Sequence, residues 1–348
     1  MTNDPTSNKK AYLIAEMSAN HNGDFDRAVA IVRAMKEAGA DAVKLQTYTA
    51  DTLTIDCDKP DFVIGAGTVW EGQKLHDLYA SAYTPWEWHA ELFALANELG
   101  MDCFSTPFDN SAVDFLEQFD PPFYKVASFE LVDVGLIEYI ASKGRPITMS
   151  TGMGSIEEIS DAVAVVKKAG VPLTLLKCTS AYPSPPSSMN LNTMRDMAER
   201  FDVPVGLSDH TLGTTVPVAA VALGASVVEK HFTLSRKDEG PDSSFSLEPA
   251  EFREMVDAIR IVEQALGEVK YERSDKEEAS VVFRRSLYAV ADIAAGEALT
   301  NENVRSIRPG HGLKPKFLSS LLGKSAAKAI PRGTPISADV VESFDVQE

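Results

Sequence analysis

The stretch VPVGLSDHTLGTTVPVAAVALGASVVEKHFTL, residues 203–234, decides the fold class. It contains two short apolar runs, residues 203–210 and 226–234, which are separated by a segment long enough for a helix. Strands that are buried on both faces of a parallel sheet have near-continuous apolar sequences of this kind. The stretch therefore predicts a strand–helix–strand unit in which polar residues stand at the ends of the strands.

The same pattern recurs along most of the chain. Six more apolar runs precede this unit, at residues 12–19, 42–47, 102–108, 123–128, 146–152 and 173–180. Amphipathic segments with helical spacing lie between them, most clearly at residues 26–40, 156–170 and 249–267. Eight strands that alternate with eight or so helices predict an α/β fold of the (β/α)8 TIM-barrel type. A doubly wound sheet is the structural alternative, and the count of eight favours the barrel.

The composition changes near residue 280. Residues 1–279 carry a net charge of −20, with 24 Lys and Arg against 44 Asp and Glu, whereas residues 280–348 carry +2, with 9 against 7. The second part contains two similar phrases, DIAAGEALTNENV at 292–304 and AIPRGTPISADVV at 329–341. We expect a barrel at residues 1–267, a polar linker at 268–280, and a small, mostly β domain with an internal repeat at 281–348.

One predicted connection of the barrel is unusually long. Residues 48–84 exceed an ordinary strand-to-helix loop, and they contain acidic and aromatic residues. This insertion is a candidate lid or interface element.

Several protein classes are excluded by composition. No run of about 18 apolar residues is present, so we expect no membrane span. Residues 1–10 are polar, and three cysteines without metal-type spacing fit a reducing compartment, so a cytoplasmic protein is expected. The net charge of −18 argues against binding to nucleic acid or to an anionic membrane.

Two histidines end adjacent predicted strands. His210 and His231 could converge on one divalent cation such as Mn, Fe, Zn or Mg, with oxygen ligands completing the shell. The alternative is that each is a core or helix-capping histidine.

Three lysines stand near strand ends. We expect Lys44, Lys125 and Lys177 to converge as a pocket for a small phosphate or carboxylate anion, supplemented by serine hydroxyls. The alternative is that they reach solvent or pair with Glu16 and Glu229. No Walker or dinucleotide glycine motif is present.

Two further residues are candidates for chemistry. Glu16 could bind a metal, take a proton from water, or orient a substrate hydroxyl. Arg308 lies in the loop phrase SIRPGHG, where a guanidinium is suited to a carboxylate or a sugar acid, although a plain surface arginine is the alternative.

Nine motifs give the chain a wider resemblance. They are AEMSANHNG (15–23), KLQTYT (44–49), FSTPF (104–108), YKVAS (124–128), MSTGM (149–153), KCTSAYP (177–183), GLSDHT (206–211), EKHF (229–232) and GPDSSFS (240–246). Together they resemble the sialic acid synthase family of phosphoenolpyruvate-dependent nonulosonate synthases, over nearly the whole chain. The phrase RPGHG and the tail resemble that family's C-terminal antifreeze-like (SAF) domain. Within the family, QTYTADTLT, VWEGQKLHDLY and TPWEWH are most similar to the pseudaminic acid synthase branch, with N-acetylneuraminate and legionaminate synthases as alternatives.

The resemblance implies a metal-dependent condensation of phosphoenolpyruvate with an amino-sugar aldehyde. It implies Mn²⁺, or Mg²⁺ or Co²⁺ in its place, on His210 and His231, and proton transfer by Glu16. The residues implied to bind phosphoenolpyruvate are Lys44, Lys125, Thr106, Ser128, Ser150, Ser180 and Ser208. Ser180 departs from the asparagine that is frequent in N-acetylneuraminate synthases. The residues implied to face the sugar are Gln46, Tyr182, Glu229 and Asp242.

The resemblance also implies a homodimer whose SAF domains are exchanged, so that Arg308 completes the partner's site. Two other functions are weighed against this one. A metal-dependent aldolase or hydrolase would share the histidines but would not need the lysines. A glycan- or ice-binding protein would use the barrel only as a scaffold.

Overall fold

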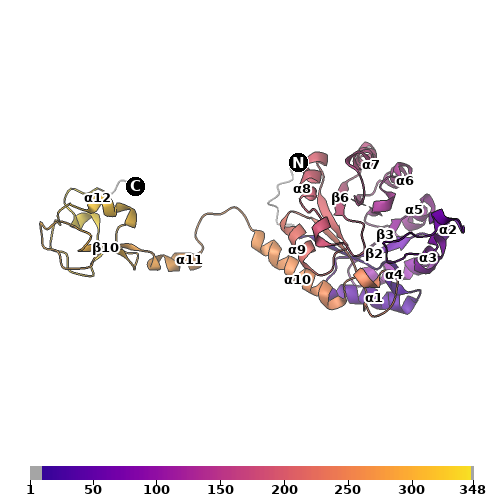
Figure 1. Cartoon of the computed structure of the whole chain (residues 1–348), viewed down its shortest axis with the longest axis horizontal. Helices are drawn as coiled ribbons and strands as arrows, with labels where there is room; N and C mark the ends of the chain where they lie inside the picture. The colour runs from indigo at the N-terminus through magenta and orange to yellow at the C-terminus, as the bar shows by residue number, and fades with distance from the viewer. Residues whose placement is uncertain (1–9, 346–348) are drawn as a thin grey trace. The chain divides into compact units, whose positions relative to one another are not determined.

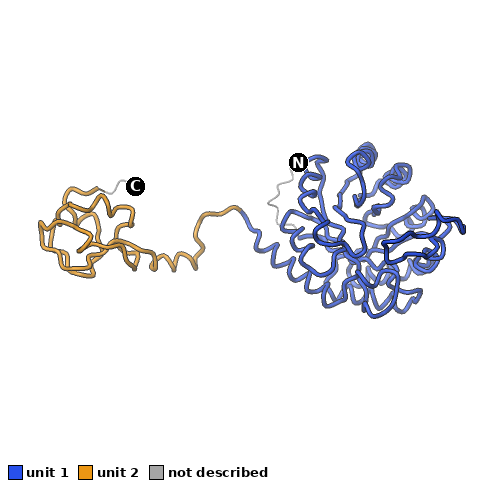
Figure 2. The backbone as a smooth tube through the Cα atoms, in the orientation of Figure 1, with its two compact units in different colours: residues 1–268 blue, residues 269–348 orange. Residues whose placement is uncertain are grey.

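The computed structural model describes residues 10–345, which belong to two compact units divided between Glu268 and Val269 (Figure 2). Residues 1–9 and 346–348 lie outside the described part, and with them most of the polar N-terminal stretch on which the cytoplasmic expectation partly rests. Within residues 10–345, none of the helices has the length and apolar character needed to cross a membrane. Each unit is described by itself.

The first unit is a nearly closed barrel of eight parallel strands, which confirms the predicted (β/α)8 fold (Figure 1). The hydrogen-bonded order is β3-β2-β1-β8-β7-β6-β5-β4, and β3 also packs beside β4. The strands are β1 (Tyr12–Glu16), β2 (Ala42–Thr47), β3 (Asp102–Pro107), β4 (Tyr124–Val126), β5 (Ile147–Ser150), β6 (Leu173–Cys178), β7 (Val205–Asp209) and β8 (Val227–His231).

Every strand leads to a helix on the outside of the barrel. Local sequence sets the helix ends: Ser155 and Glu158 form a reciprocal capping box at the start of α7, and Gly170 ends that helix in the left-handed conformation with φ of 72°. The helices that follow β1 to β8 are α1 (Phe25–Ala38), α4 (His89–Glu98), α5 (Asn110–Glu117), α6 (Val134–Ala141), α7 (Ile156–Ala169), α8 (Thr193–Phe201), α9 (Thr215–Ala222) and α10 (Pro249–Leu266).

Two apolar layers hold the barrel together, and a polar layer lies above the inner one. The larger layer packs between the strands and the outer helices. Inside the barrel, a small cluster of Ile14, Ala42 and Phe104 forms an apolar floor. Since side chains alternate between the faces of a strand, the residues two positions further along β1 and β2 also point inward, and these are Glu16 and Lys44. The period of two therefore places charged groups directly above the floor.

The insertion after β2 is ordered and contacts the mouth of the barrel. It contains α2 (Ala50–Leu53) and α3 (Leu75–Ala82), and an isolated bridge joins Val63 to Lys74. Between these elements, Trp70 donates its indole N–H to the carbonyl oxygen of Pro241 at 3.0 Å. Pro241 lies in the loop after β8, so the insertion is fastened to the loop of another strand.

The second unit is small and has a repeated hydrogen-bond pattern. It contains the antiparallel strands β9 (Ser286–Ala289) and β10 (Val304–Ile307), together with the helices α11 (Asp275–Ser280) and α12 (Leu318–Leu321). The amide of Gly296 donates to the carbonyl of Ala326, and the amide of Gly333 donates to that of Ala289, each at 2.8 Å. The two bonds are related by a shift of 37 residues: the donor moves 37 residues forward, from Gly296 to Gly333, and the acceptor moves 37 residues back, from Ala326 to Ala289. The two similar phrases in the sequence thus form two halves that complete each other. The helix α11 lies within the stretch 268–280 that the sequence predicts as a linker.

Candidate active site

Two lysines and two glutamates meet inside the carboxyl end of the barrel. Lys44 Nζ lies 2.5 Å from Glu16 Oε2 and 3.2 Å from Glu229 Oε1. Lys125 Nζ lies 3.9 Å from the same oxygen of Glu229. All four side chains are buried. Lys44 and Lys125 therefore do converge, as predicted. They also pair with Glu16 and Glu229, which the sequence analysis gives as the alternative. Since the four charges balance, an entering anion competes with the carboxylates for the two ammonium groups.

The two carboxylates differ in acidity. Burial raises the pKa of Glu16 to about 7, although the neighbouring Lys44 opposes the shift. Burial acts in the same direction on Glu229, but Lys125 and Lys44 outweigh it and lower the pKa of that carboxyl. Environments that separate the pKa values of two neighbouring carboxyls assign them different roles. Glu16 is thus the group that can exchange a proton near neutral pH.

Hydroxyl groups surround the lysines. Lys125 Nζ donates to Ser150 Oγ at 2.7 Å, and Lys44 Nζ lies 3.4 Å from Thr106 Oγ1. Ser208 donates at 3.3 Å to the glutamate that both lysines contact. The predicted anion-binding residues from five strands are therefore neighbours in space.

Ser128 and Ser180 both lie close to Gly152. The amide of Gly152 donates to Ser128 Oγ at 3.1 Å, and a Cβ atom at Gly152 would collide with both serine hydroxyls. The Ser180 hydroxyl is buried and has no hydrogen-bond partner in the described part of the chain. A hydroxyl left unpaired in a buried site is available to a ligand.

A polar chain connects the proton-exchanging glutamate to the loop after β8. Gln46 Nε2 lies 3.3 Å from Glu16 Oε1 and 2.9 Å from Ser18 Oγ, and Ser18 donates to the carboxylate of Asp242. Burial raises the pKa of Asp242. Gln46 and Asp242 are thus joined through one serine that was not predicted.

The two histidines face each other beside an aromatic cluster. The rings of His210 and His231 have centroids 5.3 Å apart. Tyr182 lies 4.3 Å from the first ring, and Phe245 lies 5.1 Å from the second, both between ring centroids. The adjacent strands β7 and β8 therefore bring the imidazoles together as predicted.

The chemistry of this pair fits a divalent cation. His210 Nδ1 lies 3.0 Å from the carbonyl oxygen of Thr179, so the protonated Nδ1 donates there and Nε2 is the ring nitrogen left for a ligand. Burial lowers the pKa of His210, but the neighbouring Cys178 outweighs it and the pKa is raised, so a cation would compete with a proton at Nε2. Burial, and next the neighbouring His210, lower the pKa of His231 well below its usual value, so that ring is neutral. His231 Nδ1 is buried without a hydrogen-bond partner in residues 10–345. Because no group of three or more His, Cys, Asp or Glu suited to a metal occurs among these residues, water or substrate oxygens would have to complete the shell.

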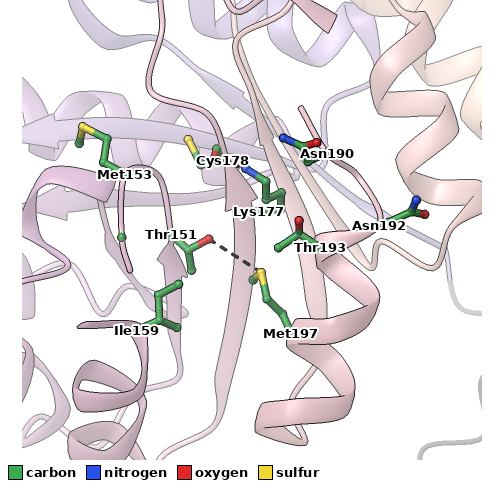
Figure 3. Close-up of a pocket in the computed structure, with 10 residues that line it drawn as sticks. Thr151, Met153, Ile159, Lys177, Cys178, Asn190, Asn192, Thr193 and Met197 are labelled. Carbon is green, nitrogen blue, oxygen red and sulfur yellow. Dashed lines mark hydrogen bonds between the residues drawn. The ribbon is translucent and has the colours of Figure 1, made fainter. Parts of the chain in front are cut away.

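Lys177 does not join the other two lysines, so that prediction is wrong. Its Nζ donates to the carbonyl of Cys178 at 2.6 Å, and it lines a cavity of about 520 Å³ with Thr151 and Asn190, bounded by α8 (Figure 3). Cys178, next in sequence, lies instead 3.9 Å from His210 Nδ1. Neighbouring residues of a strand point to opposite faces, and here the cysteine takes the inner face.

Arg308 belongs to the second unit. It is exposed and follows β10 directly. The loop after it is held by Ser286, whose hydroxyl donates to the carbonyl of Pro309 at 2.7 Å. Its participation in a barrel site stays a prediction.

Comparison with known proteins gives a consistent assignment. The model of the NeuB family matches residues 31–271, and the model of the SAF domain matches residues 284–342. The chain belongs to the NeuB family. The SAF match confirms the prediction that the C-terminal unit is an SAF domain.

Named relatives of the NeuB family cover almost the full chain. A pseudaminic acid synthase of Campylobacter jejuni subsp. jejuni (serotype O:23/36, strain 81-176) is 48% identical over 94% of this chain and 95% of its own length. An N,N'-diacetyllegionaminic acid synthase of Legionella pneumophila is 36% identical over 97% and 96%. The crystal structure of an N-acetylneuraminic acid synthetase from Leptospira borgpetersenii, in complex with citrate, has a TM-score of 0.71 and 28% identity, and the match covers 79% of this chain and 91% of that one.

Besides Ser18, three residues of this NeuB barrel were not predicted as parts of the site. Glu130 carries a buried carboxylate oxygen without a partner in the described residues, and burial raises its pKa to about 7. The other two are Cys178, which lies beside His210, and Trp70, which lies in the insertion 48–84 that the sequence predicts only as a candidate lid or interface element. Glu130 stands two residues after Ser128, in the 3-10 turn Ser128–Glu130, and this spacing is the one signal that could have identified it.

Proposed function

We propose that the chain condenses phosphoenolpyruvate with 2,4-diacetamido-2,4,6-trideoxy-altrose and water to give pseudaminic acid and phosphate. The observation that carries the proposal is the juxtaposition of two sites on one strand. On β8, Glu229 contacts both buried lysines, and His231, two residues further on the same face, lies against His210. An anionic donor at the lysines and a carbonyl acceptor at the histidines would therefore be adjacent.

The donor half of the site suits phosphoenolpyruvate. Lys44 and Lys125 would bind its phosphate and carboxylate, and the hydroxyls of Thr106, Ser150 and Ser208 would add hydrogen bonds. Ser128 and Ser180 would extend the same cradle beside Gly152. Charge-assisted hydrogen bonds in a buried site are stronger than those at a surface, so few groups suffice.

The reaction joins C3 of phosphoenolpyruvate to the aldehyde carbon of the sugar. Water adds to C2, and phosphate leaves as the bond between C2 and its oxygen breaks. Glu16 is the proposed proton acceptor for that water, because burial brings its pKa to about 7. Gln46, Tyr182, Glu229 and Asp242 would hold the hydroxyls and acetamido groups of the sugar.

His210 and His231 would hold a divalent cation, with Mn²⁺ preferred over Mg²⁺ or Co²⁺. When bound, such an ion supplies Lewis acidity that polarises the aldehyde carbonyl. The neutral state of His231 keeps a nitrogen lone pair available for this role.

The functional form is proposed to be a homodimer with exchanged SAF domains. Arg308 would then act on the sugar bound to the partner subunit's barrel. An exposed guanidinium on a loop held by a buried serine hydroxyl is suited to such a contact.

Phosphate release tests the proposal. The full chain is mixed with phosphoenolpyruvate, Mn²⁺ and one sugar at a time, and both inorganic phosphate and product mass are measured. We expect release with the diacetamido-trideoxy sugar, and a product whose mass equals both substrates plus water minus phosphoric acid. An aldolase, a hydrolase or a glycan-binding scaffold would give no release that depends on the sugar. Turnover only with N-acetylmannosamine or with the legionaminate precursor would replace the proposed acceptor.

A further inference from the structure

The insertion between β2 and α4 places one large aromatic side chain against two aromatic rings that pack on the histidine pair. Trp70 packs against Tyr182 with ring centroids 5.5 Å apart, and against Phe245 at 6.4 Å. These two rings in turn pack against each other at 5.1 Å. The three rings come from the insertion, from the loop after β6 and from the loop after β8. They form a continuous surface, called here the aromatic wall.

The wall has an inner and an outer part. Tyr182 contacts both His210 and His231, at 4.3 and 6.4 Å between ring centroids. Trp70 stacks on Tyr182 and Phe245 and makes no ring contact with either histidine. Trp70 is therefore the part of the wall furthest from the histidines.

Its indole is held in a fixed orientation. The N–H donates to the Pro241 carbonyl at 3.0 Å, so the polar edge of the ring is already satisfied. The half-buried ring thus presents mainly its apolar surface to a ligand. Asp242, which follows Pro241, lies in the polar chain that leads to Glu16. The wall and the polar chain therefore meet at the same loop.

We propose that Trp70 is a specificity-determining residue, which selects acceptor sugars that carry a methyl group at the end remote from the reacting aldehyde. The inference rests on the proposed function, since it takes the aldehyde to lie at the histidines. An open-chain sugar whose C1 lies there directs its C6 end outward along the wall to Trp70. A deoxy C6 methyl gains apolar contact with the indole, whereas a C6 hydroxyl would lose water without gaining a partner.

The magnitude follows from the size of one apolar contact. A pocket that discriminates by one methyl-sized group separates two ligands by about 10- to 100-fold. We therefore expect the wild-type chain to bind 2,4-diacetamido-2,4,6-trideoxy-altrose about 10- to 100-fold more tightly than its analogue with a C6 hydroxyl. Trp70→Ala lacks that contact, so we expect its ratio of affinities for the two sugars to fall to about threefold or less.

Equilibrium titration of the full chain with each sugar alone, followed by calorimetry, tests the inference without catalysis. Trp70→Phe keeps an aromatic ring and is expected to keep most of the preference. Val69→Ala is the matched control, because Val69 is adjacent in sequence and exposed. Far-UV circular dichroism and the melting temperature of each variant show whether it folds.

The outcomes separate this inference from the proposed function. Equal affinity of the wild type for both sugars would overturn the role of Trp70, and so would a preference that survives in folded Trp70→Ala. If Trp70→Ala does not fold, a Trp70→Phe variant that prefers the hydroxylated sugar would overturn it instead. Methyl preference without phosphate release from phosphoenolpyruvate would support Trp70 and contradict the proposed reaction.

Discussion

The buried pair Lys230–Asp209 is expected to stabilise the barrel at the point where both histidines are attached. Lys230 Nζ lies 2.5 Å from Asp209 Oδ2 and also donates to the carbonyl of Thr211, and both charged side chains are fully buried. Asp209 precedes His210, and Lys230 precedes His231. The pair therefore ties the ends of β7 and β8 together on the face opposite to the site.

The cost of breaking the pair can be worked out from its surroundings. Removing one member of a buried ion pair leaves an uncompensated charge and costs about 3–5 kcal/mol. In Lys230→Met, Asp209 would keep two hydrogen bonds from Thr211, from its amide and its hydroxyl, each at 3.0 Å. We therefore expect the lower end, about 3 kcal/mol. For a domain of this size, that loss lowers the melting temperature by about 6–12 °C.

Thermal unfolding of the full chain, followed by far-UV circular dichroism, measures the effect. The matched control is Lys168→Met, because Lys168 lies 3.7 Å from Glu138 in an exposed pair that is worth about 0–1 kcal/mol. The double variant Lys230→Met with Asp209→Asn removes both charges and should regain part of the loss. If Lys230→Met melts within about 1 °C of the Lys168→Met control, the stability assigned to this pair is wrong.

Four other predictions concern the proposed site. His231→Ala should abolish turnover and reduce bound metal, measured by elemental analysis, while the circular dichroism spectrum stays unchanged; full metal content would contradict the assignment. Lys125→Ala should raise the KM for phosphoenolpyruvate at least tenfold, on the scale of a lost charge-assisted contact, whereas Lys177→Ala should leave it within about twofold. Folding raises the pKa of Glu16, so its contribution to stability is present at low pH and is lost as pH rises through about 7; the melting temperature of Glu16→Gln relative to wild type should therefore increase from pH 5 to pH 8. Arg308→Ala should remove activity while the dimer, measured by light scattering, persists; an active variant would show that the arginine is not needed.

The fold was predictable because each strand has its own signal. Runs such as 42–47 and 203–210 are short, apolar and bounded by polar residues, so they could be located without knowing their partners. The histidine pair could be predicted equally well from the sequence, because adjacent strands of a barrel bring equivalent ends together.

The remaining features depend on information that is not local. Lys177 and Cys178 are neighbours, and which of them faces inward is set by the pairing register of β6, where a shift of one residue exchanges the faces. Trp70 reaches Pro241, which is 171 residues away, and no periodicity within the insertion encodes that contact. Long-range contacts of loops are fixed by the complete fold.

The repeat of the C-terminal unit carries opposite charges at equivalent positions. The 37-residue shift that relates its hydrogen bonds also makes Arg305 equivalent to Glu342, and Arg308 equivalent to Asp345. All four residues are exposed. Duplication of a half-unit would begin with two identical faces. The hydrogen-bond pattern is therefore repeated while the exposed residues at these equivalent positions differ in the sign of their charge, so the two ends of the unit are chemically distinct. If Arg308 acts on a ligand as proposed, only one of the two halves can make that contact.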